Sequence, residues 1–205
     1  MGRRFAELAF TPLVKKQQIE HGSRHLYERV ERSSDLGDRL GPDEQDFIQG
    51  RDGFYMASVT ESGWPYVQYR GGHEGFIHVL DERTIGFADL RGNKQYISVG
   101  NLEHDGRVAL FFMDYPRQAR LKILGRAKVH EGTEEAQKLI AQLRVPAEKT
   151  PPERAFVIHV EAFDWNCQQH ITPRYTQEEL TRILEPMRQR MEALEAENKR
   201  LKAAS

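Results

Sequence analysis

Apolar and polar residues alternate along most of the middle of the chain, as in strands that bury one face. In the stretch RLKILGRAKVH, Leu121, Ile123 and Ala127 fall on one face, and Lys122 and Arg126 fall on the other. The stretch RVALFFMD is apolar on both faces, so we expect it in the centre of a sheet or at an interface. The same pattern predicts strands over residues 54–60, 64–70, 76–80, 84–89, 107–114, 120–130 and 154–165.

The strands are joined by short polar connections, and only two helices are expected between them, over residues 93–102 and 133–144. Residues 61–63, Glu-Ser-Gly, are typical of a hairpin turn. Short strands in series with few crossover helices favour a small antiparallel barrel over a parallel α/β sheet. We therefore predict a mainly β protein of the α+β kind, with peripheral helices.

The two ends of the chain differ from the centre. Residues 1–50 are polar and charged, and they predict one or two peripheral helices followed by a short helix in PDEQDFIQGRD. We expect three segments: a helical one at 1–50, the barrel at 51–166, and a linker with a helix at 167–205.

The C-terminal segment carries a heptad pattern. Thr176 and Glu179 form a capping box at its start. Leucine or methionine occupies each d position, and Asn198 falls at an a position, which favours a parallel, two-stranded coiled coil. Pro186 is expected to kink or restart the helix. The alternative is a helix that packs on its own domain. The seam consists, in order, of Leu180, Leu184, Met187, Met191, Leu194, Asn198 and Leu201.

Composition excludes several classes of protein. The 205 residues have a formal net charge of -1, so no global field attracts nucleic acid or an anionic membrane. No apolar run is long enough to cross a bilayer, and the N-terminus lacks the apolar core of a secretory signal. The single cysteine, Cys167, excludes an intramolecular disulfide. We expect a cytoplasmic protein.

Few motifs with known chemistry occur. The histidines are scattered, so no metal site is expected. Cys167 has no base beside it and is interpreted as non-nucleophilic. The glycines of RGGHEG are too loosely spaced for a dinucleotide fingerprint.

The stretch FADLRGNKQYISVGNL leaves two interpretations open. It predicts a strand that leads through Arg91, Gly92, Asn93 and Lys94 into a helix. Free backbone N–H groups and the positive end of a helix dipole attract anions. In the other interpretation this is an ordinary turn, in which Gly92 bends the chain, Asn93 caps the helix, and the two basic side chains are solvated.

Polar residues also recur on strands that should bury their other face. In PYVQYRGG, Val67 and Tyr69 face one way, whereas Gln68 and Arg70 face the other. Gly71 then leaves room for a flat ligand or another backbone. Together with the 87–102 stretch and residues near 117, 165 and 174, these positions could form a pocket for a planar ligand with an anionic tail.

These motifs resemble the pyridoxamine 5'-phosphate oxidase-like, FMN-binding split-barrel family, and in particular its flavin-nucleotide-binding branch. The resemblance covers roughly residues 50 to 175 and rests on WPYVQYRGG, FADLRGNKQYISVGNL, MDYPRQARLKILGRAKV and DWNCQQHITPR. It implies a split antiparallel β-barrel and a homodimer with FMN at the subunit interface. Arg117 and Gln118 would come from the partner chain.

The resemblance also assigns cofactor-binding roles. Lys94 keeps the cation of the family's phosphate corner, whereas the family's serine and arginine are replaced by Gly92 and Asn93, so Arg91 is expected to compensate. The family's strand arginine falls at Gln68. The residues that the resemblance and the pattern place near FMN are Gln68, Arg70, Gly71, Phe87, Ala88, Arg91, Gly92, Asn93, Lys94, Arg117, Gln118, Trp165 and Arg174.

The resemblance implies an FMN-dependent oxidoreductase that acts on a small molecule. Pyridoxamine phosphate is not the expected substrate, because NCQQHITPR replaces the family's C-terminal arginine–histidine motif. No catalytic acid or base is predicted. The alternatives are a non-catalytic flavin-binding sensor or carrier, and a split barrel that binds haem or a deazaflavin.

Overall fold

A computed structural model describes residues 1–147, 149–165 and 169–203. The chain divides into two compact units: Met1–Asp114 with Ala119–Gln168, and Tyr115–Gln118 with Gln169–Ser205. Cys167 lies outside the described residues. Among the described helices, none is both long and apolar enough to cross a membrane.

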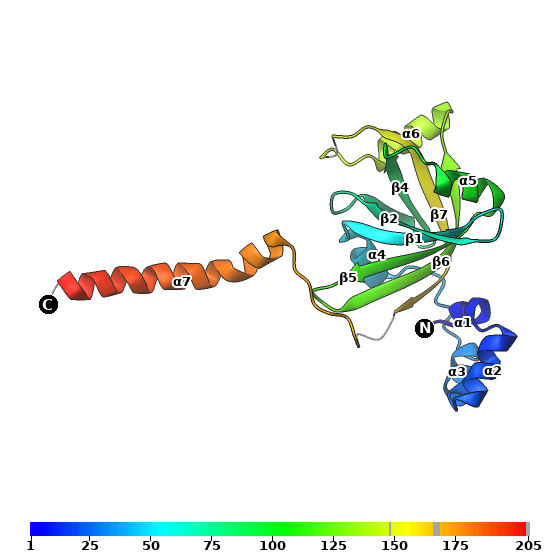
Figure 1. Cartoon of the computed structure of the whole chain (residues 1–205), viewed down its shortest axis with the longest axis horizontal. Coiled ribbons are helices and arrows are strands. Elements are labelled where there is room, and N and C mark those ends of the chain that lie inside the picture. Colours follow the sequence, from blue (N-terminus) through cyan, green and yellow to red (C-terminus); the bar gives the residue numbers. More distant parts are fainter. Residues whose placement is uncertain (148, 166–168, 204–205) are drawn as a thin grey trace. The chain divides into compact units, whose positions relative to one another are not determined.

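The first unit is built on one antiparallel sheet of seven strands in the order β2-β1-β5-β6-β7-β4-β3. Its two edge strands, β2 and β3, are not hydrogen-bonded to each other, so the barrel is split between them (Figure 1). The predicted split antiparallel barrel is therefore confirmed, and β5, which was expected in the centre or at an interface, lies inside the sheet between β1 and β6. The strands are β1 (Gly53–Val59), β2 (Pro65–Gly71), β3 (Ile77–Asp81), β4 (Thr84–Leu90), β5 (Arg107–Asp114), β6 (Ala119–His130) and β7 (Pro152–Trp165).

Aromatic side chains fill the interior of the barrel. Phe54 on β1 stacks on Phe112 of β5 with ring centroids 4.9 Å apart, and Phe87 on β4 stacks on Phe156 of β7 at 5.0 Å. Phe54 and Phe87 meet edge to face at 5.5 Å. Such pairs contribute about 0.5–1.5 kcal/mol beyond the area they bury. They join strands from the two halves of the sheet.

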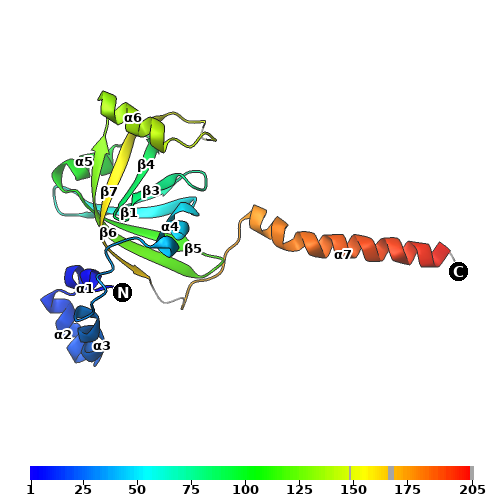
Figure 2. The ribbon, with the colours of Figure 1, turned by 180° about the vertical axis from the view of Figure 1, so that it is seen from behind.

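Helices lie at the periphery of the first unit (Figures 1 and 2). Three helices precede the short helix in PDEQDFIQGRD where one or two were predicted, because a short helix at the N-terminus was missed. The short helix in PDEQDFIQGRD is confirmed, and the predicted 133–144 helix is found one residue shorter at each end. The helices are α1 (Arg3–Ala9), α2 (Pro12–Glu20), α3 (Arg24–Glu31), α4 (Pro42–Gln49), α5 (Ile97–His104) and α6 (Glu134–Leu143).

Local sequence explains where two of these helices begin. Thr133 caps α6 by accepting a hydrogen bond from the backbone N–H of Ala136 at 3.1 Å, and two glutamates fill the first turn. α4 starts with Pro42 at its first position, and Glu44 accepts the backbone N–H of Gly41 at 2.9 Å. α6 then packs on β7 and β4, whereas α4 packs on β3.

The second unit contains α7 (Gln177–Ala203), a helix of 27 residues. The predicted capping box is confirmed: Thr176 Oγ1 accepts the backbone N–H of Glu179 at 3.1 Å, and Glu179 Oε2 accepts that of Thr176 at 2.7 Å. The helix continues through Pro186, so the predicted restart is wrong. Since the exposed neighbouring turns keep their hydrogen bonds, the loss at one proline is tolerated.

Candidate functional site

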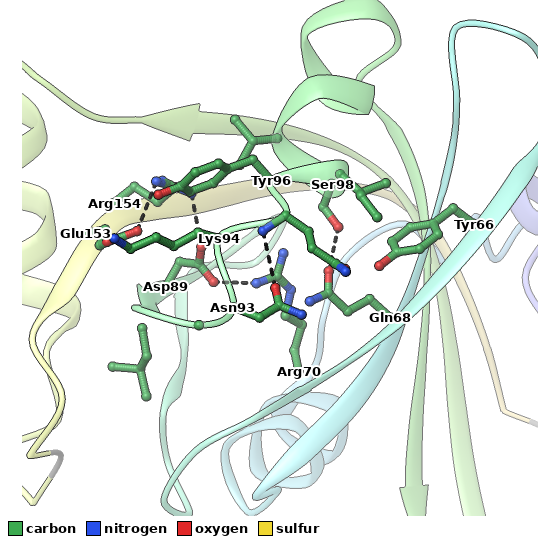
Figure 3. A pocket seen from close by; sticks show the side chains of 15 residues that line it. Tyr66, Gln68, Arg70, Asp89, Asn93, Lys94, Tyr96, Ser98, Glu153 and Arg154 are labelled. Atoms are coloured by element: carbon green, nitrogen blue, oxygen red, sulfur yellow. Dashed lines mark hydrogen bonds and ion pairs between the residues drawn. The ribbon is translucent and has the colours of Figure 1, made fainter.

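An open pocket of about 430 Å³, with the solvent at its mouth included, lies where the barrel is split (Figure 3). β2, β4, β7 and the segment from β4 into α5 all contribute to it. The lining residues are Tyr66, Gln68, Arg70, Asp89, Leu90, Gly92, Asn93, Lys94, Gln95, Tyr96, Ile97, Ser98, Val99, Glu153 and Arg154.

The edge strand β2 presents its polar face to this pocket. Gln68 and Arg70 pair in register with Met56 and Phe54, which are buried in the barrel. Val67 and Tyr69, on the opposite face, are 60% and 55% exposed. The expectation that the apolar face of this strand is buried is therefore wrong within one chain. The polar side chains can point inward because each finds a partner there.

These partners come from α5 and β4. The Gln68 side-chain oxygen accepts a hydrogen bond from the Ser98 hydroxyl at 2.8 Å, and Arg70 forms an ion pair with Asp89. α5 is fixed further by a hydrogen bond from Asn101 to the Ser58 hydroxyl at 2.9 Å. Through these contacts, side chains connect β2 to α5 and to β4, a strand that is not its neighbour in the sheet.

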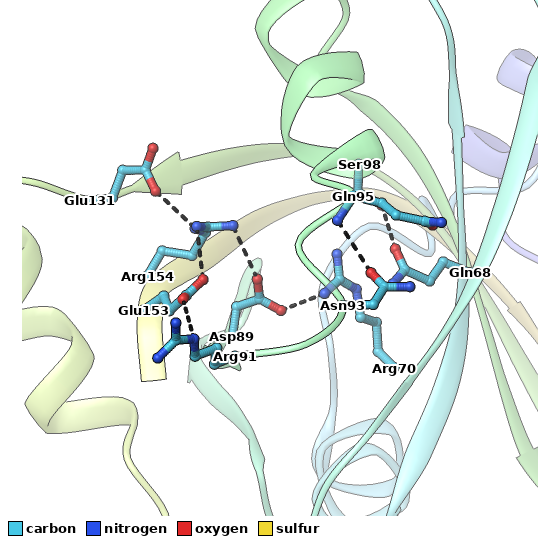
Figure 4. Close-up of polar contacts among 10 residues, drawn as sticks. All are labelled: Gln68, Arg70, Asp89, Arg91, Asn93, Gln95, Ser98, Glu131, Glu153 and Arg154. Carbon is cyan, nitrogen blue, oxygen red and sulfur yellow. Dashed lines mark hydrogen bonds and ion pairs between the residues drawn. The ribbon is translucent and has the colours of Figure 1, made fainter. Parts of the chain in front are cut away.

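A buried charge network crosses the split (Figure 4). Asp89 sits between Arg70 and Arg154, and Arg154 Nη1 lies 3.7 Å from its second carboxylate oxygen. Arg154 also pairs with Glu131 at 2.8 Å and with Glu153 at 3.2 Å. Asp89 and Arg154 are directly paired on the antiparallel strands β4 and β7. Burial of such charges is stable only when each has partners.

Burial sets the titration of this network. It raises the pKa of Asp89, although attraction to Arg70 and Arg154 offsets part of the shift. Burial also lowers the pKa of Arg70. For Arg154, burial acts in the same direction, but attraction and hydrogen bonding to its acidic neighbours prevail, so the pKa is raised. The two guanidiniums remain charged at neutral pH.

The segment between β4 and α5 is shaped by two left-handed residues. Lys94 has φ 59° and Tyr96 has φ 53°, so both non-glycine residues adopt the left-handed conformation. Asn93 Oδ1 accepts the backbone N–H of Gln95 at 3.2 Å, which closes a turn. α5 begins only at Ile97. The prediction of a helix from Asn93, capped by that residue, is therefore wrong.

Gly92 does not make the bend that was expected of it. Its φ is not left-handed, and a Cβ built there meets nothing within 4 Å. The reversal comes instead from Lys94 and Tyr96, which Asn93 and the stack of Arg154 over the Tyr96 ring at 4.8 Å support. Alternation of ordinary and left-handed backbone turns N–H groups toward a common point, an arrangement that binds anions.

Lys94 is the available cation of the pocket. Its side chain is exposed and has no hydrogen bond or ion pair within the part of the chain that the structure describes. Arg70 and Arg154, by contrast, are committed to carboxylates. An anion could therefore bind Lys94 and the backbone of its turn directly, whereas binding to Arg70 or Arg154 would require it to displace a carboxylate.

Five of the thirteen predicted cofactor-binding residues line this pocket, and others lie elsewhere in the first unit. Phe87 is buried in the aromatic interior, and Ala88, on the other face of β4, packs near α6. A Cβ on Gly71 would meet the Tyr69 ring at 2.8 Å, so its missing side chain makes room for that ring. Arg91 pairs with Glu153 at 3.5 Å. The five that line the pocket are Gln68, Arg70, Gly92, Asn93 and Lys94.

Trp165, another predicted cofactor-binding residue, packs against α4 in the first unit. Its indole Nε1–H donates to Glu44 at 2.6 Å, and its ring meets Phe47 of α4 edge to face at 4.7 Å. The remaining three predicted residues belong to the second unit. There, Gln118 donates to the backbone carbonyl of Ile171 at 2.6 Å, and the Arg174 guanidinium lies 5.2 Å from the Tyr115 ring centroid. Arg117 is exposed in the same turn.

Sequence reasoning missed Asp89 and Arg154. A signal was available, because residues two apart on a strand point to the same face. Asp89 is two residues from the buried Phe87, and Arg154 is two residues from the buried Phe156, so both should point inward. A charged residue at an inward position of an apolar strand needs an opposite charge. Tyr96 and Ser98 gave no comparable signal.

This split barrel matches a known family. The family model described as pyridoxamine 5'-phosphate oxidase matches residues 40–167. The chain therefore belongs to the pyridoxamine 5'-phosphate oxidase family. The comparison with curated proteins gives no match.

The solved structures that match this chain are distant in sequence. A protein from Lactobacillus delbrueckii described as a pyridoxamine 5'-phosphate oxidase is 22% identical, with 62% of this chain and 94% of that chain covered and a TM-score of 0.49. HupZ of Group A Streptococcus is 22% identical, with 66% and 100% covered and a TM-score of 0.47. An FMN-binding protein from Syntrophomonas wolfei is 12% identical, with 73% and 97% covered and a TM-score of 0.47. Identities this low carry no information about a shared ligand.

Proposed function

We propose that the chain is an FMN-binding flavoprotein that acts as an oxidoreductase on a small molecule. The observation that carries this proposal is Lys94, which lines the pocket on a left-handed turn, is exposed, and has no charged or hydrogen-bonding partner among the described residues. Membership of the pyridoxamine 5'-phosphate oxidase family supports a flavin in a pocket of this kind.

The phosphate end of FMN fits the turn at Lys94. A phosphate monoester carries close to two negative charges at neutral pH. Lys94 would supply a positive charge, and the backbone N–H groups near Tyr96 would supply hydrogen bonds. Charged contacts of this type contribute roughly 1.5–3 kcal/mol each, so three or four contacts plus ring burial would give micromolar affinity or better.

The ring of FMN needs a flat and partly apolar wall. Tyr66, Leu90, Ile97 and Val99 line the same pocket beside the amide of Gln68. These four side chains would give the ring apolar contact in a pocket that is otherwise lined mainly by polar and charged residues. Bound FMN would exchange electrons or hydride with its substrate, while the chain supplies position and electrostatics. Gln68 would orient the ring, and Ser98 holds the Gln68 amide in place.

We further propose that the protein acts as a homodimer through the outer face of β2, β1 and β5. Val67 and Tyr69 on this face are exposed, and Tyr55 beside them is 40% exposed. A contiguous exposed apolar face is characteristic of an interaction surface. A second copy suits it because β2 also lines the pocket, so Arg117 and Gln118 of the partner chain would approach the cofactor across the interface.

Spectroscopy of the purified protein tests the cofactor. We expect a yellow protein whose flavin is released on denaturation and identified as FMN by mass. A colourless protein that binds no added FMN at saturating concentration would contradict the proposal. A haem spectrum, or the spectrum and mass of a deazaflavin, would favour the alternative ligands instead.

Anaerobic reduction then tests the oxidoreductase. NADH or NADPH should bleach the flavin, and candidate acceptors should restore its colour. Stable FMN that neither nicotinamide nor any other donor reduces would favour a sensor or carrier. Sedimentation at micromolar concentration should give twice the chain mass, whereas a monomer would contradict the dimer.

A further inference from the structure

We propose that α7 pairs with α7 of a second copy of this chain as a parallel, in-register, two-stranded coiled coil. This inference goes beyond the flavin site and does not depend on it. The heptads place Leu184, Met191 and Asn198 at a, and Leu180, Met187, Leu194 and Leu201 at d.

The apolar seam of α7 is open to solvent in the single chain. Each leucine and methionine of the seam is between 44% and 63% exposed. A helix that is apolar along one narrow stripe, with a repeat of seven, is typical of coiled-coil pairing. Pro186 falls at a c position, on the outside of such a pair, so its missing N–H does not disturb the seam.

The charges beside the seam fit a parallel pair. In this arrangement, a g residue faces the e residue five positions further along the partner helix. Arg190 would then face Glu195 of the partner subunit, and Glu197 would face Lys202 of the partner subunit. Both pairs are attractive.

The single chain leaves these four charges without partners. Within the described residues, Arg190, Glu195, Glu197 and Lys202 form no ion pair. Arg188 differs, because its cross-helix neighbour would be the apolar Ile183. It pairs instead within its own helix, with Glu185 at 3.2 Å and Glu192 at 3.8 Å.

Asn198 decides between parallel and antiparallel pairing. One antiparallel register would also bring Arg190 near Glu197 of the partner subunit, so charge alone does not exclude it. In an antiparallel pair, however, each residue at an a position packs opposite a residue at a d position of the partner helix, and every d residue here is leucine or methionine. Asn198 would then bury its amide without a hydrogen-bonding partner, which is costly. In the parallel register it meets Asn198 of the partner subunit, and the two amides can bond.

Thiol exchange in the full chain tests the pairing. In a Cys167→Ser background, Leu201→Cys places a thiol at a d position, and Ala196→Cys places one on the outer face as a matched control. In a glutathione redox buffer, we expect the effective concentration of the two thiols at position 201 to exceed that of the two thiols at position 196 at least tenfold. Equal values for the two positions would overturn the proposal, even if the barrels themselves dimerise.

A charge exchange tests the predicted partners. Glu197→Lys in the Leu201→Cys background would bring lysine against Lys202 and lower the effective concentration roughly two- to tenfold. Adding Lys202→Glu should restore it. Failure of the double variant to recover would overturn the parallel register. A colourless protein that passes both tests would refute the flavin site and leave this inference intact.

Discussion

The pocket and α7 use charged side chains in opposite ways. In the pocket, Arg70, Asp89 and Arg154 are buried, and they connect strands that are distant in sequence. On α7 the charges are exposed, and those that pair do so within one or two turns. Ion pairs of the first kind are coupled to the fold, because separation leaves a charge in a poor environment. Those of the second kind contribute little to stability and act on partner choice.

The largest expected effect comes from breaking the buried network. Arg70→Ala leaves Asp89 buried with only the more distant Arg154, so we expect the free energy of unfolding to fall by about 3 kcal/mol. Denaturant unfolding measures this change. The matched control is Arg188→Ala on α7, for which we expect a loss of about 0.5 kcal/mol or less. Similar losses for the two variants would remove the contrast between the regions.

The next effect concerns the free cation. Lys94→Ala should weaken FMN binding about tenfold or more, because one charged contact of roughly 1.5–3 kcal/mol is lost. Fluorescence titration measures the affinity. Riboflavin lacks the phosphate, so its binding should not change in this variant. Lys128→Ala, on the outer face of β6, is the control for overall charge. Unchanged FMN affinity would show that Lys94 is merely solvated.

A smaller effect is expected from the cap of α7. Thr176→Ala removes the acceptor for the backbone N–H of Glu179, at a cost of about 1 kcal/mol to the first turn of the helix. Hydrogen exchange should accelerate at residues 177–181, while the barrel amides keep their protection. Faster exchange throughout the barrel would contradict the division into two units.

The smallest expected effect concerns pH: the contributions of Asp105 and Asp89 to the free energy of unfolding should change in opposite directions as pH rises. Hydrogen bonds from Arg107 lower the pKa of the half-buried Asp105 to about 2, whereas burial raises the pKa of Asp89. The contribution of Asp105 is present above its unfolded pKa near 4 and is lost as pH falls toward 2. That of Asp89 is present below its unfolded pKa and is lost as pH rises through the folded value. Carboxyl NMR titration should place the two on opposite sides of the ordinary aspartate pKa.

The sequence was sufficient for the strands and for the split barrel. Period-two alternation identifies most strands, because strands such as β1 and β6 bury every second residue along much of their length. The error at β2 has a physical cause: Gln68 and Arg70 point inward only because Ser98 and Asp89 meet them there. Such partners come from other parts of the chain, and alternation along one strand does not reveal them.

The candidate site was predicted in part. Residues 92–94 were expected in an anion-binding corner, and they do line the pocket. The origin of the bend was misassigned to Gly92, since a left-handed Lys94 or Tyr96 is uncommon and depends on surrounding contacts that local preference does not encode. Roles in binding FMN remain predictions for all thirteen residues.

The split between the edge strands β2 and β3 has a consequence for how a ligand would enter and leave the pocket. A closed barrel would admit a ligand only at its ends, whereas here the side between β2 and β3 is open, and the ion pair between Arg70 and Asp89 joins β2 to β4 next to this opening. Because this ion pair is buried, dissolved salt should screen it much less than the exposed ion pairs of α7, so ionic strength should change the rate of ligand exchange through this opening only a little.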